Sequence, residues 1–160
     1  MLAIYPGSFD PVTSGHFDII KRAAGMLESV VVLVAVNSSK QPLFTADERV
    51  ELLRQACVDL PNVRVEKLSD ELLVTYAQRI GAQVIVKGLR AVSDFEYEFQ
   101  MALLNRHLQP DVETVFLMTS AEHSYLSSSI IKEIGRLGGD VTGLVPPVVQ
   151  PFLQAKFTKI

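Results

Sequence analysis

The sequence predicts an α/β fold: one doubly wound domain, residues 1–160, in which a parallel five-stranded sheet has helices on both faces. Short apolar runs rich in β-branched residues alternate along the chain with segments of helical period, as in parallel sheets. The runs are too apolar to have a face in water, which indicates strands buried on both sides. A length of 160 residues, 48% of them hydrophobic, suits one sizeable core.

The five expected strands are the apolar runs at about residues 2–5, 30–36, 63–67, 84–86 and 114–118. Two helices are expected where apolar residues recur every three or four positions, namely Phe17, Ile20, Ala24 and Leu27, and then Val50, Leu53, Cys57 and Leu60. This order of strands and helices predicts a Rossmann-like domain.

Several helix ends are also marked. Capping-box spacing occurs at Thr45 with Glu48 and at Ser93 with Glu96. A later apolar stripe runs from Ile130 to Leu137, and the glycines at 138 and 139 end it. The prolines at 146 and 147 introduce a last helix.

Composition excludes several classes of protein. The net charge of −3 and the pI of about 5.6 argue against a general nucleic-acid binder. The longest apolar stretch, residues 30–36, is too short to span a membrane, and the first residues lack a secretion signal. A single cysteine, Cys57, predicts neither an internal disulfide nor a zinc cluster. We therefore expect a cytoplasmic protein with no membrane or nucleic-acid partner.

The first apolar run ends in a loop rich in glycine and hydroxyl groups, residues 7–15, which leads into a helix whose first residues include His16. Backbone N–H groups at a helix N-terminus are unpaired and carry partial positive charge, so they favour an anion. A glycine allows the backbone to approach closely, and a serine and a histidine add donors. The sequence therefore predicts a phosphate site here.

Three more polar segments follow expected strands, where open parallel sheets bind their ligands. They are residues 37–40 (Asn-Ser-Ser-Lys), 87–90 (Lys-Gly-Leu-Arg) and 124–129 (Ser-Tyr-Leu-Ser-Ser-Ser). With the first loop they supply donors for several phosphate oxygens, as a triphosphate requires.

Simpler interpretations remain open for single residues. His16 could cap its helix, Lys40 could be a solvated charge, and the serines at 127–129 could cap their helix as well as bind. Glu98 could be solvated at an acidic helix start or could reach a ligand hydroxyl group. His123 precedes the serines and is a further candidate for ligand contact.

The P-loop pattern G-x-x-x-x-G-K-[ST] and the dinucleotide pattern G-x-G-x-x-G are absent. Residues 13–16 (Thr-Ser-Gly-His) and 127–132 (Ser-Ser-Ser-Ile-Ile-Lys) resemble instead the two signatures of the nucleotidyltransferase superfamily. A closer resemblance, to the bacterial phosphopantetheine adenylyltransferases, runs from about residue 2 to residue 146. Its motifs are residues 5–11 (Tyr-Pro-Gly-Ser-Phe-Asp-Pro), 87–91 (Lys-Gly-Leu-Arg-Ala), 94–98 (Asp-Phe-Glu-Tyr-Glu) and 125–129 (Tyr-Leu-Ser-Ser-Ser).

The resemblance implies transfer of the adenylyl group of ATP to 4'-phosphopantetheine, giving dephospho-coenzyme A and pyrophosphate, the penultimate step of coenzyme A biosynthesis. It also implies Mg²⁺ carried mainly by the ATP phosphates, a homohexamer, and feedback inhibition by coenzyme A. The attacking group is already a phosphate, so we expect in-line displacement with electrostatic stabilisation and no covalent intermediate.

Residue roles follow from the same resemblance. The catalytic residues are His16, Ser8, Lys40 and Arg90, with His16 at the α-phosphate. The ATP-binding residues are Ser8, Phe9, His16, Gly88, Leu89, Arg90, Glu98, His123, Ser124, Tyr125, Leu126, Ser127, Ser128 and Ser129. The phosphopantetheine-binding residues are Ser8, Lys40, Leu73 and Lys87. No residue is assigned as a metal ligand.

Two positions depart from common patterns. Many members of the family have arginine at the position of Lys87, and lysine keeps the charge there but loses the bidentate fork. Lys132 replaces the arginine that usually ends the second signature in the wider superfamily, and lysine there is typical of the phosphopantetheine branch. Two rival functions remain: a transferase acting on nicotinate mononucleotide or pairing CTP with a polyol phosphate, and a module that senses ATP without turnover.

Overall fold

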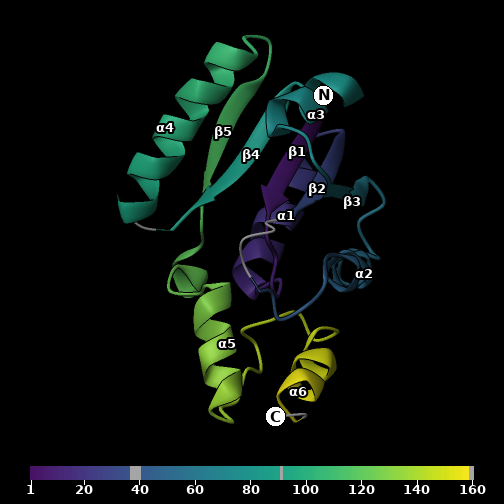
Figure 1. Cartoon of the computed structure of the whole chain (residues 1–160), viewed down its shortest axis with the longest axis vertical. Coiled ribbons are helices and arrows are strands. Elements are labelled where there is room, and N and C mark those ends of the chain that lie inside the picture. The colour runs from purple at the N-terminus through teal and green to yellow at the C-terminus, as the bar shows by residue number, and fades with distance from the viewer. Residues whose placement is uncertain (37–40, 91, 159–160) are drawn as a thin grey trace.

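The structure, a computed structural model, describes residues 1–36, 41–90 and 92–158. Its strands are β1 (Leu2–Gly7), β2 (Ser29–Ala35), β3 (Val63–Leu68), β4 (Val84–Leu89) and β5 (Glu113–Met118). Its helices are α1 (Ser14–Met26), α2 (Ala46–Ala56), α3 (Leu73–Ile80), α4 (Val92–Leu108), α5 (Ser128–Arg136) and α6 (Gln150–Thr158), with a 3₁₀ turn at Ala121–His123 before α5. Figure 1 shows α5 and α6 beyond one end of the sheet, and α4 alongside β4 and β5.

All five strands are parallel and lie in the order β3-β2-β1-β4-β5, which confirms the predicted sheet. From β1 the chain builds outward through β2 to β3, and then crosses back to build β4 and β5 on the other side. The connection that follows β1 therefore runs toward one edge of the sheet, and the connection that follows its neighbour β4 runs toward the other edge. In such sheets a crevice opens beyond the carboxyl ends of those two strands, and ligands bind in it.

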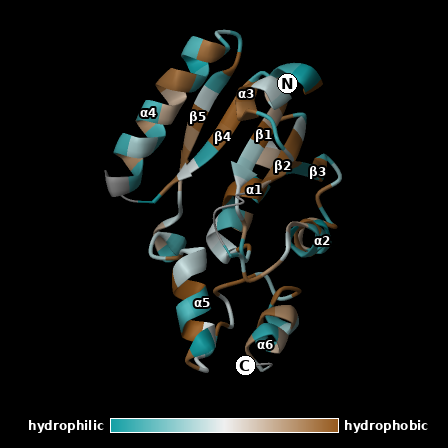
Figure 2. Ribbon diagram, in the orientation of Figure 1, coloured by the Kyte–Doolittle hydropathy of each residue, from teal (hydrophilic) through white to brown (hydrophobic). Residues whose placement is uncertain are grey.

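Apolar residues cover both faces of the sheet, as predicted. On one face, Ala3 and Tyr5 of β1 belong to a cluster that includes residues of α1, α2, α5 and α6. On the other face, Ile4 of β1 packs in a second cluster with Val74 and Ala77 of α3. Successive residues of β1 thus enter different cores, as the two-residue period of a strand requires. Figure 2 shows the hydrophobic residues along the central strands.

Three strands differ from the prediction. β4 continues past Val86 through Lys87 and Gly88 because its pairing with β5 continues there, opposite Phe116 and Leu117. The edge strands β3 and β5 are not buried on both faces, since Arg64 of β3 is exposed and Met118 of β5 is 65% exposed. Among the described helices, none is both long and apolar enough to cross a membrane.

Candidate active site

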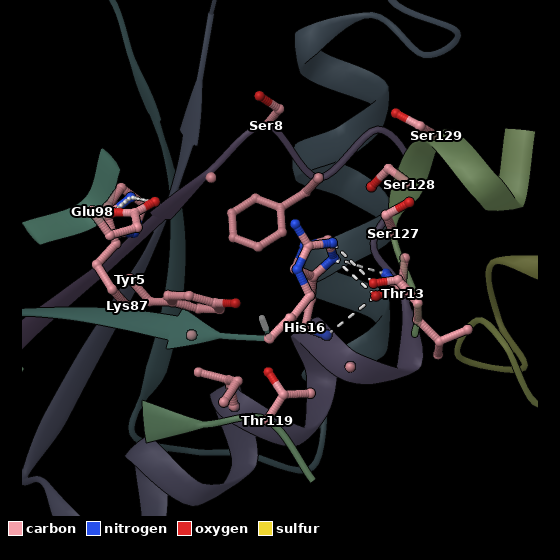
Figure 3. A pocket seen from close by; sticks show the side chains of 18 residues that line it. Tyr5, Ser8, Thr13, His16, Lys87, Glu98, Thr119, Ser127, Ser128 and Ser129 are labelled. Atoms are coloured by element: carbon pink, nitrogen blue, oxygen red, sulfur yellow. Dashed lines mark hydrogen bonds and ion pairs between the residues drawn. The ribbon is translucent and has the colours of Figure 1, made fainter. Parts of the chain in front are cut away.

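A cavity of about 490 Å³ lies at the carboxyl ends of β1 and β4, where the fold predicts a ligand (Figure 3). Its walls come from the end of β1 and the loop after it, the first turn of α1, the end of β4, α4, and the start of α5. The lining residues are Tyr5, Pro6, Gly7, Ser8, Phe9, Thr13, Gly15, His16, Ile19, Lys87, Gly88, Arg90, Glu98, Thr119, Leu126, Ser127, Ser128 and Ser129.

His16 is oriented by the cap of its own helix. Thr13 is the N-cap residue of α1, and its hydroxyl oxygen accepts the His16 N–H at 3.2 Å. In return, the Thr13 N–H donates to Nδ1 of the His16 ring at 3.1 Å. Histidine thus takes the place of the usual glutamate or glutamine in a capping box. The first and last residues of the Thr-Ser-Gly-His motif therefore hold each other in place through these two hydrogen bonds.

This contact also sets the chemistry of the ring. Because Nδ1 accepts the Thr13 N–H, the proton of the neutral imidazole lies on Nε2, the nitrogen left to a ligand. Burial, together with the positive charge of Arg90, lowers the pKa of His16 from 6.5 to about 4. At neutral pH, His16 therefore offers the cavity an uncharged N–H donor.

Phe9 packs against the His16 ring in a backbone conformation that is unusual for a residue with a side chain, with a φ of +50°. Its buried ring makes edge-to-face contacts with the rings of Tyr5 and His16, at centroid distances of 5.4 and 5.1 Å. Gly7 makes room for it, because a Cβ at that position would lie 2.8 Å from the Phe9 ring. Strained backbone of this kind is frequent at functional sites.

The β4 wall holds a cation and an anion together. The Lys87 ammonium lies 3.2 Å from Oε2 of Glu98 on α4 and donates to Oε1 at 3.3 Å. Oε2 of Glu98 is buried and accepts no hydrogen bond within the part of the chain that the structure describes. Such an acceptor is suited to a ligand hydroxyl group.

Arg90 and the start of α5 form the wall opposite Lys87. Nη1 of Arg90 donates to the Leu126 carbonyl at 2.9 Å, and Nε pairs with Asp94 at 3.1 Å. The Ser127 hydroxyl caps α5 by accepting the Ile130 N–H, as one of the simpler interpretations predicted. The helix N-terminus with its unpaired N–H groups thus lines the cavity, which suits an anion.

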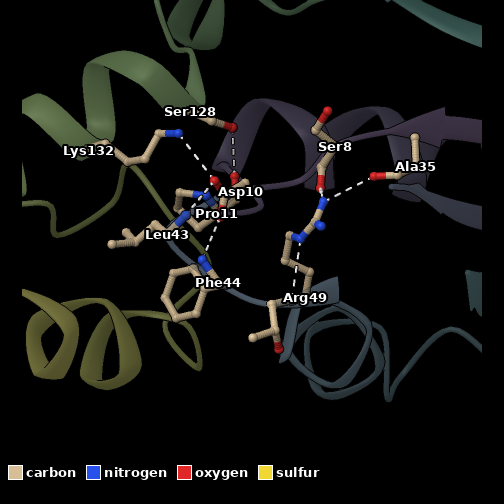
Figure 4. A network of polar contacts seen from close by, with 10 residues as sticks. Ser8, Asp10, Pro11, Ala35, Leu43, Phe44, Arg49, Ser128 and Lys132 are labelled. Carbon is tan, nitrogen blue, oxygen red and sulfur yellow. Dashed lines mark hydrogen bonds and ion pairs between the residues drawn. The ribbon is translucent and has the colours of Figure 1, made fainter. Parts of the chain in front are cut away.

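Behind the cavity, a polar network joins three segments (Figure 4). The buried carboxylate of Asp10 accepts the N–H groups of Leu43 and Phe44 at 2.9 and 2.8 Å, and Lys132 of α5 lies 3.2 Å away. The Ser128 hydroxyl donates to the Pro11 carbonyl at 2.8 Å. Hydrogen bonds and an ion pair therefore connect the loop after β1 to α5 and to the segment before α2.

The structure brings together most of the residues predicted for the site. Those that line the cavity are Ser8, Phe9, His16, Lys87, Gly88, Arg90, Glu98, Leu126, Ser127, Ser128 and Ser129. Those described residues that do not line it are Leu73, Leu89, His123, Ser124 and Tyr125. Lys40 lies outside the described residues.

Position along the chain did not reveal which way these side chains face. Leu89 is buried at the end of β4, and Leu73 packs at the edge of the core on the α3 face. Tyr125 is 63% exposed. His123 lies just behind the wall, since a Cβ on Gly15 would be 3.5 Å from its Cβ.

Sequence reasoning missed two polar residues. Thr119 lines the cavity directly after β5, and the rule that ligands bind beyond strand ends could have found it. Arg49 of α2 is only 4% exposed and donates to the carbonyl of Ser8. It lies four positions before Leu53 of the predicted stripe, so helical spacing places it on the buried face.

The arrangement is suited to binding phosphate oxygens. A neutral N–H donor, two cationic side chains, hydroxyl groups and a helix N-terminus surround one space. Within the described ranges, no three His, Cys, Asp or Glu side chains are grouped so that they could hold a metal ion.

Comparison with known proteins agrees with this chemistry. Residues 4–134 match the family described as Cytidylyltransferase-like. The phosphopantetheine adenylyltransferase of Caldanaerobacter subterraneus subsp. tengcongensis is 56% identical over 158 residues, which cover 99% of this chain and 98% of that protein. The enzyme of the same name from Heliobacterium modesticaldum is 53% identical, covering 98% of this chain and 92% of its own.

A solved structure supports the fold alone. The bifunctional NMN adenylyltransferase/ADP ribose pyrophosphatase from Francisella tularensis superposes with a TM-score of 0.74 at 14% identity. The match covers 99% of this chain and 50% of that longer one.

Proposed function

The chain belongs to the phosphopantetheine adenylyltransferases of the Cytidylyltransferase-like family, and we propose how its cavity carries out their reaction. The enzyme transfers the adenylyl group of ATP to 4'-phosphopantetheine and releases dephospho-coenzyme A and pyrophosphate. The observation that carries the mechanism is the convergence of His16, Lys87, Arg90 and the α5 N-terminus on one cavity.

The reaction needs no nucleophile or base from the protein. An oxygen of the acceptor phosphate attacks the α-phosphorus of ATP in line, and the bond from that phosphorus to the pyrophosphate leaving group breaks. The Nε2–H of His16 donates to the α-phosphate oxygens as negative charge builds up there. Catalysis therefore consists of positioning and electrostatic stabilisation, with no covalent intermediate.

The residues predicted for the site divide between the two substrates, and those that do not line the cavity are assigned by the family resemblance alone. Lys87, with Ser8 and with Lys40, holds the acceptor phosphate, and Leu73 lines the pantetheine arm. Arg90, Ser128 and Ser129 hold the β- and γ-phosphates at the start of α5. Gly88, Leu89 and residues 123–126 frame the adenosine, and Oε2 of Glu98, which accepts no hydrogen bond from the described residues, accepts one from a ribose hydroxyl.

Mg²⁺ enters as part of the substrate. The ion prefers phosphate oxygens and keeps several of its waters, so a triphosphate carries it without an all-protein cage. In the cavity it neutralises charge on the phosphates, and the residues of this chain hold the oxygens that remain.

The enzyme is a homohexamer, and the exposed apolar face of α4 supports self-association. Phe95, Phe99 and Leu103 of this face are each between 46% and 55% exposed, and the neighbouring edge strand β5 exposes Met118. Monomers rarely leave such patches open to water. The number of six subunits rests on the family resemblance.

In the cytoplasm, coenzyme A inhibits the enzyme because it contains the same phosphopantetheine arm as the acceptor substrate.

The acceptor is tested by pyrophosphate release. Purified full-length enzyme is mixed with MgATP and with 4'-phosphopantetheine, nicotinate mononucleotide or no acceptor. We expect release only with 4'-phosphopantetheine, in step with dephospho-coenzyme A. Release only with nicotinate mononucleotide would overturn the substrate, and ATP binding with no release under any condition would indicate a sensor.

A further inference from the structure

Arg49 is a buried cation that touches main-chain oxygens near the cavity without lining it. Its guanidinium Nη1 donates to the Ser8 carbonyl at 2.6 Å and to the Ala35 carbonyl at 3.1 Å, and Nε donates to the Thr45 carbonyl at 3.4 Å. No ion pair among residues 1–36, 41–90 and 92–158 includes Arg49. A charge buried in this way is costly and calls for an explanation.

The two shorter contacts lie where β1 and β2 separate. In the parallel register Gly7 is opposite Val34, so Ser8 and Ala35 are the next positions along the two strands. The pairing of β1 ends there, and the guanidinium spans the two carbonyl groups instead (Figure 4). Arg49 therefore sets the direction in which the chain leaves β1.

The peptide group between Ser8 and Phe9 carries this effect to the cavity. In a planar trans peptide the C=O and the following N–H point in opposite directions. Arg49 lies behind the wall and attracts the Ser8 oxygen, so the Phe9 N–H is turned to the other side, where Ser8 and Phe9 line the cavity. An oxygen that would repel a phosphate is thereby replaced by a donor that binds one.

We infer that Arg49 is a positioning residue for phosphate binding: by holding the Ser8 carbonyl, it aims the Phe9 N–H and the Ser8 side chain at the substrate phosphates. The inference rests on the proposed function of the cavity. The positive charge of Arg49, set directly behind this wall, further favours an anion there.

The test compares substitutions at two arginines of α2. R49M removes the guanidinium and its charge but keeps an apolar stem. R49K keeps the charge on a single nitrogen and so loses the Nε contact with the Thr45 carbonyl that helps to orient the group. R54M is the matched control, because Arg54 is exposed and donates to the Val65 carbonyl away from the cavity. The readouts are kcat/KM for 4'-phosphopantetheine, inhibition by pantetheine, which lacks the phosphate, and circular dichroism.

For R49M we expect kcat/KM to fall by about 10- to 100-fold, as for a small misplacement of reacting groups, with pantetheine inhibition unchanged. R49K is expected to recover part of the loss, and R54M to match the wild type. Equal loss of phosphopantetheine and pantetheine affinity in R49M would overturn the inference, as would wild-type kcat/KM.

If R49M does not fold, the R49K variant provides the test. A folded R49K with reduced kcat/KM supports the inference, whereas wild-type kcat/KM, or unfolding of both variants, overturns it. An inactive wild-type enzyme would contradict the proposed function instead, so the two failures are distinguishable.

Discussion

At the scale of single residues, the chemistry of the site depends on how His16 is held. The Thr13 N–H occupies Nδ1, and burial keeps the ring neutral, so the donor on Nε2 does not change over the physiological pH range. A lysine at this position would be a strongly hydrated charge on a flexible stem. The imidazole instead provides a fixed donor, as the proposed stabilisation of the α-phosphate requires.

Removing that donor is expected to affect the chemical step. His16→Ala should lower kcat by about 10²- to 10³-fold, the usual loss for one donor to a developing oxyanion, with little change in ATP affinity. Steady-state kinetics and ATP titration measure the two quantities. Turnover near that of the wild type would contradict the role of His16.

The partly buried ring also makes stability depend on pH. The pKa of His16 falls from 6.5 to about 4 on folding, so the unfolded chain binds the proton more tightly and acid favours unfolding. The neutral ring costs nothing above pH 6.5, and about 3 kcal/mol of stability is lost as the pH falls from 6.5 to 4.

Urea unfolding at pH 7 and pH 4.5 measures this loss. We expect His16→Asn, which cannot be protonated, to lose less stability over this interval than the wild type. The same pH dependence in both proteins would show that other groups cause it.

At the scale of elements, α1 and α2 begin with the same capping box but differ in function. Thr13 pairs with His16 at the cavity, and Thr45 pairs with Glu48 away from its lining. The two helix starts therefore form a matched pair, in which both caps stabilise a helix and one also holds the ring proposed to act at the α-phosphate.

Removing each cap separates these roles. Thr13→Ala and Thr45→Ala should each cost about 1 kcal/mol of stability, or roughly 2–4 °C in Tm for a chain of this size. Only Thr13→Ala should also lower kcat, because it removes the hydroxyl oxygen that lies 3.2 Å from the His16 backbone nitrogen and 3.1 Å from Nδ1 of its ring, while the backbone N–H of residue 13 stays. Equal kcat values in the two variants would show that the Thr13 hydroxyl group is not needed to orient His16.

Much of this could be predicted from the sequence, because local patterns carry it. The alternation of apolar runs and helical stripes predicted the sheet, and the loop and serine motifs predicted the two helix starts at the cavity. The directions of the side chains in residues 123–125 depend on the 3₁₀ turn, which has no clear pattern. The role of Arg49 was not predicted because arginine is rarely buried. Its acceptors, the carbonyl oxygens of Ser8 and Ala35, come together only when β1 and β2 lie side by side in the folded chain.

At the scale of the whole molecule, the exposed apolar face of α4 supports the proposed self-association. Phe95 and Phe99 stack at 5.7 Å on this exposed surface, and Leu103 continues the row at the same spacing of four residues. Glu98 belongs to the same helix and lines the cavity. Subunit contacts on α4 would therefore lie close to the site.

Self-association is tested with a charge on this face. Leu103→Glu should shift the protein to smaller species in light scattering after gel filtration. Val58→Glu, at another exposed apolar position on a different surface, should leave the assembly unchanged. A wild-type monomer, or no effect of Leu103→Glu, would contradict this assignment of the surface.

In the proposed mechanism, both substrates lie in one cavity and react directly with each other. The stereochemical course at the α-phosphorus tests it, with one isomer of an ATP analogue that carries sulfur on the α-phosphate, and with 4'-phosphopantetheine as acceptor. A single in-line displacement inverts the configuration, and inversion is the result that we expect. Retention would require two displacements through an adenylylated protein group, and it would contradict the account.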